Sequence, residues 1–182
     1  MNKLTIDTAE ALALQLRSKL GLGTHEPINA KTLIRQLDYM LHYRPLSESL
    51  LGMSLKSPDS LYKFILINSN TTRGRQHFTI AHEIYHLEFE EDIYPHYNRT
   101  DREVNVSERN ADMFACALLM PRQGIISKIP ASELASKNIS IETCLTLGQL
   151  YGVSHSTLVF RLKELKLITQ ENEQKLMQIK VK

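Results

Sequence analysis

Two histidines and a glutamate form the pattern in this 182-residue chain that is best suited to chemistry. His82, Glu83 and His86 make up an HExxH motif. Histidines four positions apart share one face of a helix, with Cβ atoms about 5–6 Å apart, and two imidazoles at that spacing can bind one zinc ion. Glu83 lies one step around the helix, where it reaches a zinc-bound water instead of the metal. The alternative, two surface histidines on a charged helix, is less favoured because an apolar strand segment precedes the motif.

A catalytic zinc site needs at least one further protein ligand, and three candidates follow from the sequence. The extended HExxHxxGxxH motif is absent, since Phe89 stands at its glycine position and Asp92 at its histidine position. Glu90 lies two turns after His82 on the same helix, and three ligands along one helix face do not converge on one ion. The third candidate is Glu108, at the start of the next predicted helix.

Glu108 is favoured because of the residues that follow it. Glu108 and Asp112 are four positions apart and so share a helix face, and the small Ala111 lets this helix approach the HExxH helix. We therefore predict that Glu108 binds zinc while Asp112 orients a ligand histidine through its free ring N–H. The alternative is that Glu108 is merely an acidic residue stabilised by the helix dipole.

Periodicity, caps and turn residues predict the elements that position these side chains. Asp7 or Thr8 is the expected cap of a first helix that ends near residue 20, and Ser107 is the expected cap of the helix after the motif. The other predicted helices cover residues 30–37, 76–88, 108–120, 141–151 and 154–165. The predicted strands cover residues 39–43, 50–55 and 62–68, of which the last two form a hairpin and the last is central. Residues 91–107 are polar and contain Pro95, which favours a surface loop.

These elements predict an α+β, zincin-like fold that is mostly helical. A small, three-stranded and mainly antiparallel sheet is expected beside the HExxH helix. Residues 1–124 are predicted to form the metallopeptidase domain. Residues 125–182 are predicted to form a helical extension that packs on it and contains a pair of helices resembling a helix-turn-helix, with the turn at Gly152.

Composition narrows the class of protein. Apolar residues make up 42% of the chain and charged residues 23%, as in an ordinary globular protein. The formal charge of +2 argues neither for nor against a nucleic-acid partner, because such partners usually need a concentrated basic face. The two cysteines lack metal-type spacing, so we expect no disulfide, with Cys116 buried in an apolar run. No apolar stretch approaches about 18 residues, and the amphipathic N-terminal segment does not read as a signal peptide. We expect a cytoplasmic protein.

The residues around the motif resemble the ImmA/IrrE family of metallopeptidases. Residues 75–86 read RQHFTIAHEIYH and residues 108–121 read ERNADMFACALLMP, against the family pattern of an R-x-x-F-T-x-A-H-E-x-G-H block and a later E-x-x-A-N-x-F-A-x-x-L-L-M-P block. The strand that ends in Asn68 and residues 150–165 extend the resemblance. Tyr85 replaces the usual glycine and Asp112 the usual asparagine, and neither change removes a ligand.

The resemblance implies a zinc endopeptidase with a narrow substrate. Family members are associated with cleaving or inactivating a helix-turn-helix repressor, often encoded beside them on mobile elements. Two other functions stay open: a DNA-binding regulator with a structural or vestigial zinc site, and a component of a toxin–antitoxin pair. An intact HExxH motif with a credible third ligand favours the peptidase.

The sequence leaves two details of such an enzyme open. The donor to the developing oxyanion is one of several candidates: Tyr85, His77, Tyr94, His96 or Tyr97. The C-terminal helix pair is expected to pack on the catalytic domain or dock the substrate instead of reading DNA, with Leu158 and Leu162 on the inner face of its last helix. The residues that it offers to a possible DNA groove are His155, Ser156, Thr157, Arg161 and Lys163.

Overall fold

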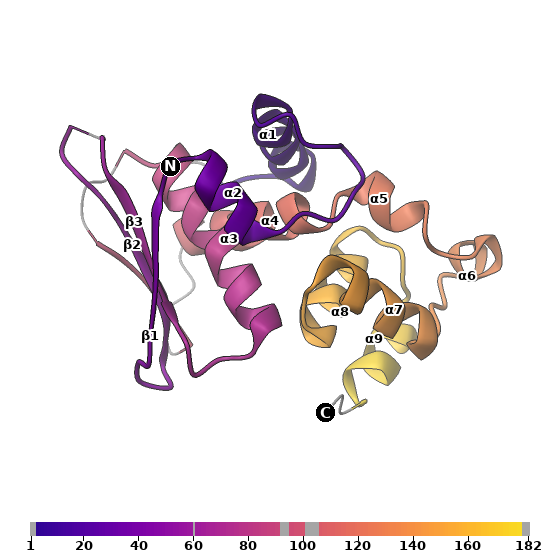
Figure 1. The fold of residues 1–182 in the computed structure, drawn as a ribbon. Coiled ribbons are helices and arrows are strands. Elements are labelled where there is room, and N and C mark those ends of the chain that lie inside the picture. The colour runs from indigo at the N-terminus through magenta and orange to yellow at the C-terminus, as the bar shows by residue number, and fades with distance from the viewer. Residues whose placement is uncertain (1–2, 60, 92–94, 101–105, 180–182) are drawn as a thin grey trace.

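The computed structural model describes residues 3–59, 61–91, 95–100 and 106–179. Its sheet lies at one end and its C-terminal helices at the other, with α3 and α4 between them (Figure 1). The strands are β1 (Met40–Arg44), β2 (Leu50–Lys56), β3 (Lys63–Asn68) and β4 (His96–Arg99). The helices are α1 (Ile6–Lys19), α2 (Ala30–Gln36), α3 (Arg73–Phe89), α4 (Val106–Leu119), α5 (Arg122–Ile126), α6 (Ala131–Ser136), α7 (Ile141–Tyr151), α8 (His155–Glu164) and α9 (Gln170–Met177).

Within the described residues the sheet has four strands in the order β1-β3-β2-β4, so the prediction of three strands is wrong. The missing strand is β4, which lies in the polar stretch that was predicted to be a loop. It pairs antiparallel with β2 at the edge of the sheet. An edge strand with one exposed face carries no run of apolar residues, because it has little core to contact, and this is why the sequence did not indicate it.

The sheet is mixed, and two of the three strand pairs that the structure describes are antiparallel, as expected for a mainly antiparallel sheet. The predicted hairpin of β2 and β3 is confirmed, and β3 is central as expected, but β1 runs parallel to β3. Because β3 lies between β1 and β2 in the sheet, the loop from β1 to β2 must cross the end of β3, where the fully buried Asn68 binds it. Its Oδ1 accepts from the Leu46 N–H at 3.1 Å, and its Nδ2 donates to the carbonyls of Ser47 and Leu50 at 3.0 and 2.8 Å. The loop between β1 and β2 is thereby fixed across the end of β3.

Helix α3 lies close against β2 because of a glycine. A Cβ atom on Gly52 would stand 2.8 Å from the Leu66 carbonyl oxygen and 2.8 Å from Thr79 Cγ2, distances that real Cβ atoms do not tolerate. Residues 52, 54 and 56 of β2 are buried while 53 and 55 are more exposed, so this alternating face is turned toward α3.

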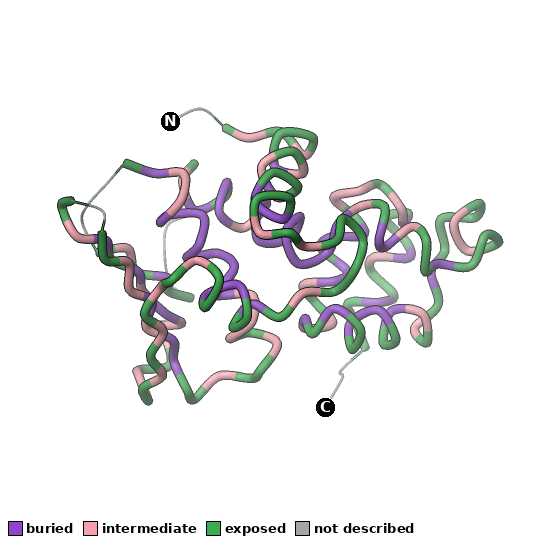
Figure 2. The backbone as a smooth tube through the Cα atoms, turned by 45° about the horizontal axis from the view of Figure 1, so that its top comes forward, coloured by how far each residue is buried: buried purple, intermediate pink, exposed green. Residues whose placement is uncertain are grey.

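The core is densest along α3 and α4, where buried segments run through the middle of the molecule (Figure 2). Tyr85 packs there against Phe114 and Phe89, with ring centroids 5.6 Å away in both cases. Ala81 and Ala111 are both fully buried, in accord with the expectation that small residues let these two helices approach.

Three helix starts differ from the sequence prediction. Thr5, not Asp7 or Thr8, caps α1, since its side chain accepts from the Thr8 N–H. Helix α3 begins three residues early because Thr72 accepts from the Arg75 N–H. Ser107 lies inside α4, and its hydroxyl donates to Glu90 Oε1 at 2.5 Å instead of capping the helix. A side chain with several possible partners is assigned only by the tertiary structure.

The C-terminal helices pack on the rest of the chain through a buried arginine. Arg161 of α8 is 0% exposed; its guanidinium donates to the Met120 carbonyl at 3.2 Å and pairs with Glu164 at 2.6 Å and with Glu10 of α1. The expectation that Arg161 faces a possible groove is therefore wrong. A buried guanidinium needs such partners to offset the loss of hydration. Leu158 and Leu162 are buried as expected, and the boundary at residue 124 stays a prediction.

The cysteines are Cys116 and Cys144, both free and buried, as the sequence predicted for Cys116. Burial raises the pKa of the Cys144 thiol to about 12, and an undissociated thiol is a poor nucleophile. Among the described residues, no helix has the length and apolar character needed to cross a membrane.

Candidate metal centre

The two histidines of the motif converge on one point from the same face of α3. Their Nε2 atoms lie 3.1 Å apart, and the residues are 0% and 3% exposed for His82 and His86 respectively. This pair is the product of helical periodicity, since positions four apart stack one turn above the other.

Glu108 brings a carboxylate from α4 to the same point. Its Oε2 lies 3.4 Å from His82 Nε2 and its Oε1 lies 3.7 Å from His86 Nε2. A zinc ion with bonds of about 2.0–2.1 Å in tetrahedral geometry sets its ligand atoms about 3.3 Å apart. The three side chains that the sequence proposed as ligands therefore form a buried triangle of a size that can hold a metal ion.

The charge of the surrounding groups also fits a cation. The carboxylates of Glu83, Glu90, Glu108 and Asp112 all lie at this centre. Burial opposes charging of His82, but hydrogen bonds to Asp112 and Glu108 outweigh it and raise the pKa of its imidazole to about 9. Several buried carboxylates repel one another unless a positive charge is present, so a divalent ion suits this donor set.

A carboxylate orients each of the two histidines. His82 Nδ1 lies 2.8 Å from Asp112 Oδ1, which is the contact predicted for Asp112, and His86 Nδ1 lies 2.8 Å from Glu90 Oε2. When each Nδ1–H donates to its carboxylate, each Nε2 presents a lone pair to the centre. Sequence reasoning considered Glu90 only as a ligand and missed this role, although its position four residues after His86 was the available signal.

Removing the Glu90 carboxylate is expected to weaken metal binding. Without its acceptor the His86 ring loses its fixed tautomer and orientation, and such changes lower metal affinity about 10–100-fold. Glu90→Ala should show this loss in competition with a chromophoric chelator. The exposed neighbour Glu91 provides the matched control, Glu91→Ala. Equal affinities in the two variants would contradict the role of Glu90.

Glu83 is fully buried beside the triangle. Its Oε2 accepts from the Ser54 hydroxyl at 2.6 Å, whereas its Oε1 has no hydrogen-bond partner within the described part of the chain. Burial raises the pKa of the Glu83 carboxyl. The sequence gave no indication of Ser54, because a serine in a short strand has many ordinary explanations.

Of the candidate oxyanion donors that the structure describes, His96 lies nearest the centre. Its ring stacks on His86 with centroids 3.4 Å apart, and its Nδ1 is 3.3 Å from Glu108 Oε1. Tyr85 is buried in the aromatic core between α3 and α4. Tyr97 is half-exposed and follows His96 on β4, so its side chain points to the opposite face. Tyr94 lies outside the described residues.

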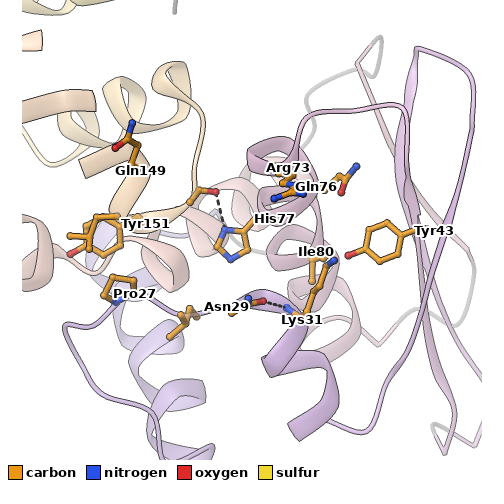
Figure 3. Close-up of a pocket in the computed structure, with 13 residues that line it drawn as sticks. Pro27, Asn29, Lys31, Tyr43, Arg73, Gln76, His77, Ile80, Gln149 and Tyr151 are labelled. Atoms are coloured by element: carbon orange, nitrogen blue, oxygen red, sulfur yellow. Dashed lines mark hydrogen bonds between the residues drawn. The ribbon is translucent and has the colours of Figure 1, made fainter. Parts of the chain in front are cut away.

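The remaining candidate, His77, lies beside a separate cavity of about 720 Å³ at the N-terminal half of α3 (Figure 3). Its Nδ1–H donates to the Gly152 carbonyl at 3.0 Å, and its Nε2 accepts from the Ala30 N–H at 3.1 Å. Lys31 lies over the Tyr43 ring, 4.8 Å from its centroid. His77 thus connects α2 and α3 to the turn before α8, and none of the three predicted ligands lines this cavity.

An HExxH helix packs on a mixed sheet, and a glutamate from the following helix completes a buried His–His–Glu group that can hold a metal ion, an arrangement typical of HExxH proteins. The chain belongs to the Peptidase_M78 family, whose model, described as IrrE N-terminal-like domain, matches residues 34–163. This confirms the resemblance noted in the sequence and assigns the chain to a family of peptidases.

A solved structure supports the fold. A Mycobacterium tuberculosis transcriptional regulator superposes with a TM-score of 0.56 at 17% sequence identity, over 87% of this chain and 47% of that one. The present chain thus spans about half the length of that protein. No curated protein matches the sequence.

Proposed function

We propose that this protein is a zinc-dependent endopeptidase that cleaves a specific protein, such as a helix-turn-helix transcriptional repressor. The observation that carries the proposal is the triangle of His82, His86 and Glu108, with Glu83 buried beside it. A structural zinc site would more often have four protein ligands and no adjacent buried glutamate. The repressor as substrate rests on the family resemblance.

The chemistry follows from the positions of these groups. Zinc, when bound, lowers the pKa of a coordinated water and polarises the peptide carbonyl. Glu83 takes the proton as the water attacks and delivers it to the leaving amine. Its Oε1 atom, which has no other partner among the described residues, is the one available for this transfer. His82 and His86 are held in position by Asp112 and Glu90, so the site is ordered before the substrate arrives.

A peptide library tests the activity without a known substrate. The zinc-loaded protein is incubated with peptides derived from a whole proteome, and new termini are identified by mass spectrometry. We expect cleavage at a restricted set of sequences that stops with 1,10-phenanthroline and returns with added zinc. No new termini, or termini that persist in the chelator, would contradict the proposal. A purified helix-turn-helix repressor that contains a recovered sequence then tests the substrate class.

The alternative functions are a DNA-binding regulator and a toxin–antitoxin component, and the contacts of α8 speak against the first. His155 Nε2–H donates to the Leu176 carbonyl at 2.8 Å, and Lys163 pairs with Glu173 at 2.8 Å. With Arg161 buried, each basic side chain proposed for a groove has a partner within the chain. Phosphate contacts need cations that are free to bind DNA. This favours packing or substrate docking as the role of the helix pair.

A further inference from the structure

We propose that Ser54 is a positioning residue for the catalytic base: its hydroxyl holds Glu83 Oε2 so that Oε1 stays free to accept the proton. The inference rests on the proposed function, because it assigns a task to a residue next to the metal centre. It goes beyond the motif, since Ser54 lies on β2, 29 positions away from Glu83 in the chain.

The register between β2 and α3 places the two side chains together. Gly52 and Ser54 are two positions apart on one face of the strand, and Thr79 and Glu83 are four positions apart on one face of the helix. Two strand residues span about 6.6 Å and four helix residues about 6 Å, so the two rows match. Gly52 lies against Thr79. Two residues further along the strand and four along the helix, Ser54 Oγ lies 2.6 Å from Glu83 Oε2.

Lys56 continues the same row along β2. Its ammonium donates to the backbone carbonyl of Glu90 at the end of α3. The strand thus contacts the helix at three successive points, Thr79, Glu83 and the Glu90 carbonyl, which leaves little freedom to shift Ser54 relative to Glu83. Helix and strand are the kind of rigid elements on which a catalytic group is held accurately.

The hydrogen bond itself selects one orientation of the carboxylate. Ser54 and Glu83 are 1% and 0% exposed, so bulk water has little access to the bond between them, and a hydroxyl donating to a carboxylate at this distance is a strong bond. A carboxylate bound at one oxygen cannot rotate without losing it. The other oxygen then keeps a constant direction, as general-base catalysis requires.

The Ser54 hydroxyl is not needed to hold β2 in the sheet. Residue 54 pairs with Ile65 on one side and with His96 on the other through the backbone ladders of β2. These ladders do not use the side chain. Loss of the hydroxyl should therefore change the properties of Glu83 more than the stability of the sheet.

The test uses the Co²⁺-substituted full-length protein and acetohydroxamic acid, followed by the visible spectrum of the metal. A hydroxamate binds a divalent metal through two oxygens and forms a hydrogen bond with a carboxyl group beside the metal, so its affinity reports where the Glu83 carboxyl group is held. Ser54→Ala is expected to weaken acetohydroxamate binding about tenfold, as for loss of one charge-assisted hydrogen bond, with unchanged Co²⁺ stoichiometry. Ser54→Thr keeps the hydroxyl and should restore binding. The partly exposed Ser57, three residues on, gives the control Ser57→Ala.

The outcomes separate this inference from the proposed function. If Glu83→Gln weakens acetohydroxamate binding but Ser54→Ala does not, Ser54 has no positioning role and the proposal is overturned. If the protein takes up no Co²⁺, the metal centre is wrong. If Co²⁺ binds but Glu83→Gln has no effect, Glu83 is not the base, and the proposed mechanism fails together with the role of Ser54. If the extra methyl of Ser54→Thr lowers the melting temperature, Ser54→Cys replaces it. A thiol is a weaker donor than a hydroxyl, so Ser54→Cys should bind acetohydroxamate with an affinity between those of the parent protein and Ser54→Ala. An affinity as low as that of Ser54→Ala would contradict the proposal. With a cleaved peptide, Ser54→Ala should lower kcat and leave KM unchanged.

Discussion

Replacing Glu83 with glutamine is expected to lower kcat/KM for peptide hydrolysis about 10²–10⁴-fold, the usual contribution of a general base. Gln has nearly the same shape and can still accept from the Ser54 hydroxyl, so the packing beside the centre should persist. It cannot accept the proton of the attacking water. The metal triangle does not include residue 83, and zinc content should remain one per chain. Quantified cleavage of a library-derived peptide and elemental analysis measure the two quantities.

The matched control for this substitution is Glu91→Gln, which makes the same chemical change at an exposed position. It should leave hydrolysis unchanged. If Glu83→Gln cleaved the peptide as fast as the parent protein, another group would be the base and the mechanism proposed here would fail.

The second large effect is expected at Glu108, whose replacement by alanine should remove most of the bound metal. Loss of a direct ligand should exceed the about 10–100-fold loss that follows removal of an orienting partner. The helix should survive, because alanine favours helical backbone and Glu108 lies in the first turn of α4. The measurements are the zinc affinity in chelator competition and the melting temperature of the metal-free protein.

Arg109→Ala is the control, since this neighbouring side chain is exposed on α4. Stoichiometric zinc in Glu108→Ala after dialysis would show that Glu108 is not a ligand. The two substitutions together distinguish base from ligand: Glu83→Gln should lose hydrolysis and keep metal, whereas Glu108→Ala should lose both.

The sequence determined those parts of the centre that depend on the helical repeat alone. His82 and His86 share a face because they are four residues apart, and the same spacing brings Glu108 and Asp112 together on α4. The central position of β3 likewise follows from its apolar residues on both faces. These patterns are local, so they are read without knowledge of the fold.

Only the tertiary structure decided which distant residues meet. Strand β4 has no apolar periodicity, and it forms because the edge of β2 offers its backbone for pairing. This pairing brings His96 against His86. Ser54 reaches Glu83 through the matched register of β2 and α3. The sequence around Arg161 predicts a surface cation, but the side chain is buried against α1 and the end of α4. Hydrogen bonds and ion pairs between separate elements depend on packing geometry, and no spacing along the chain specifies that geometry.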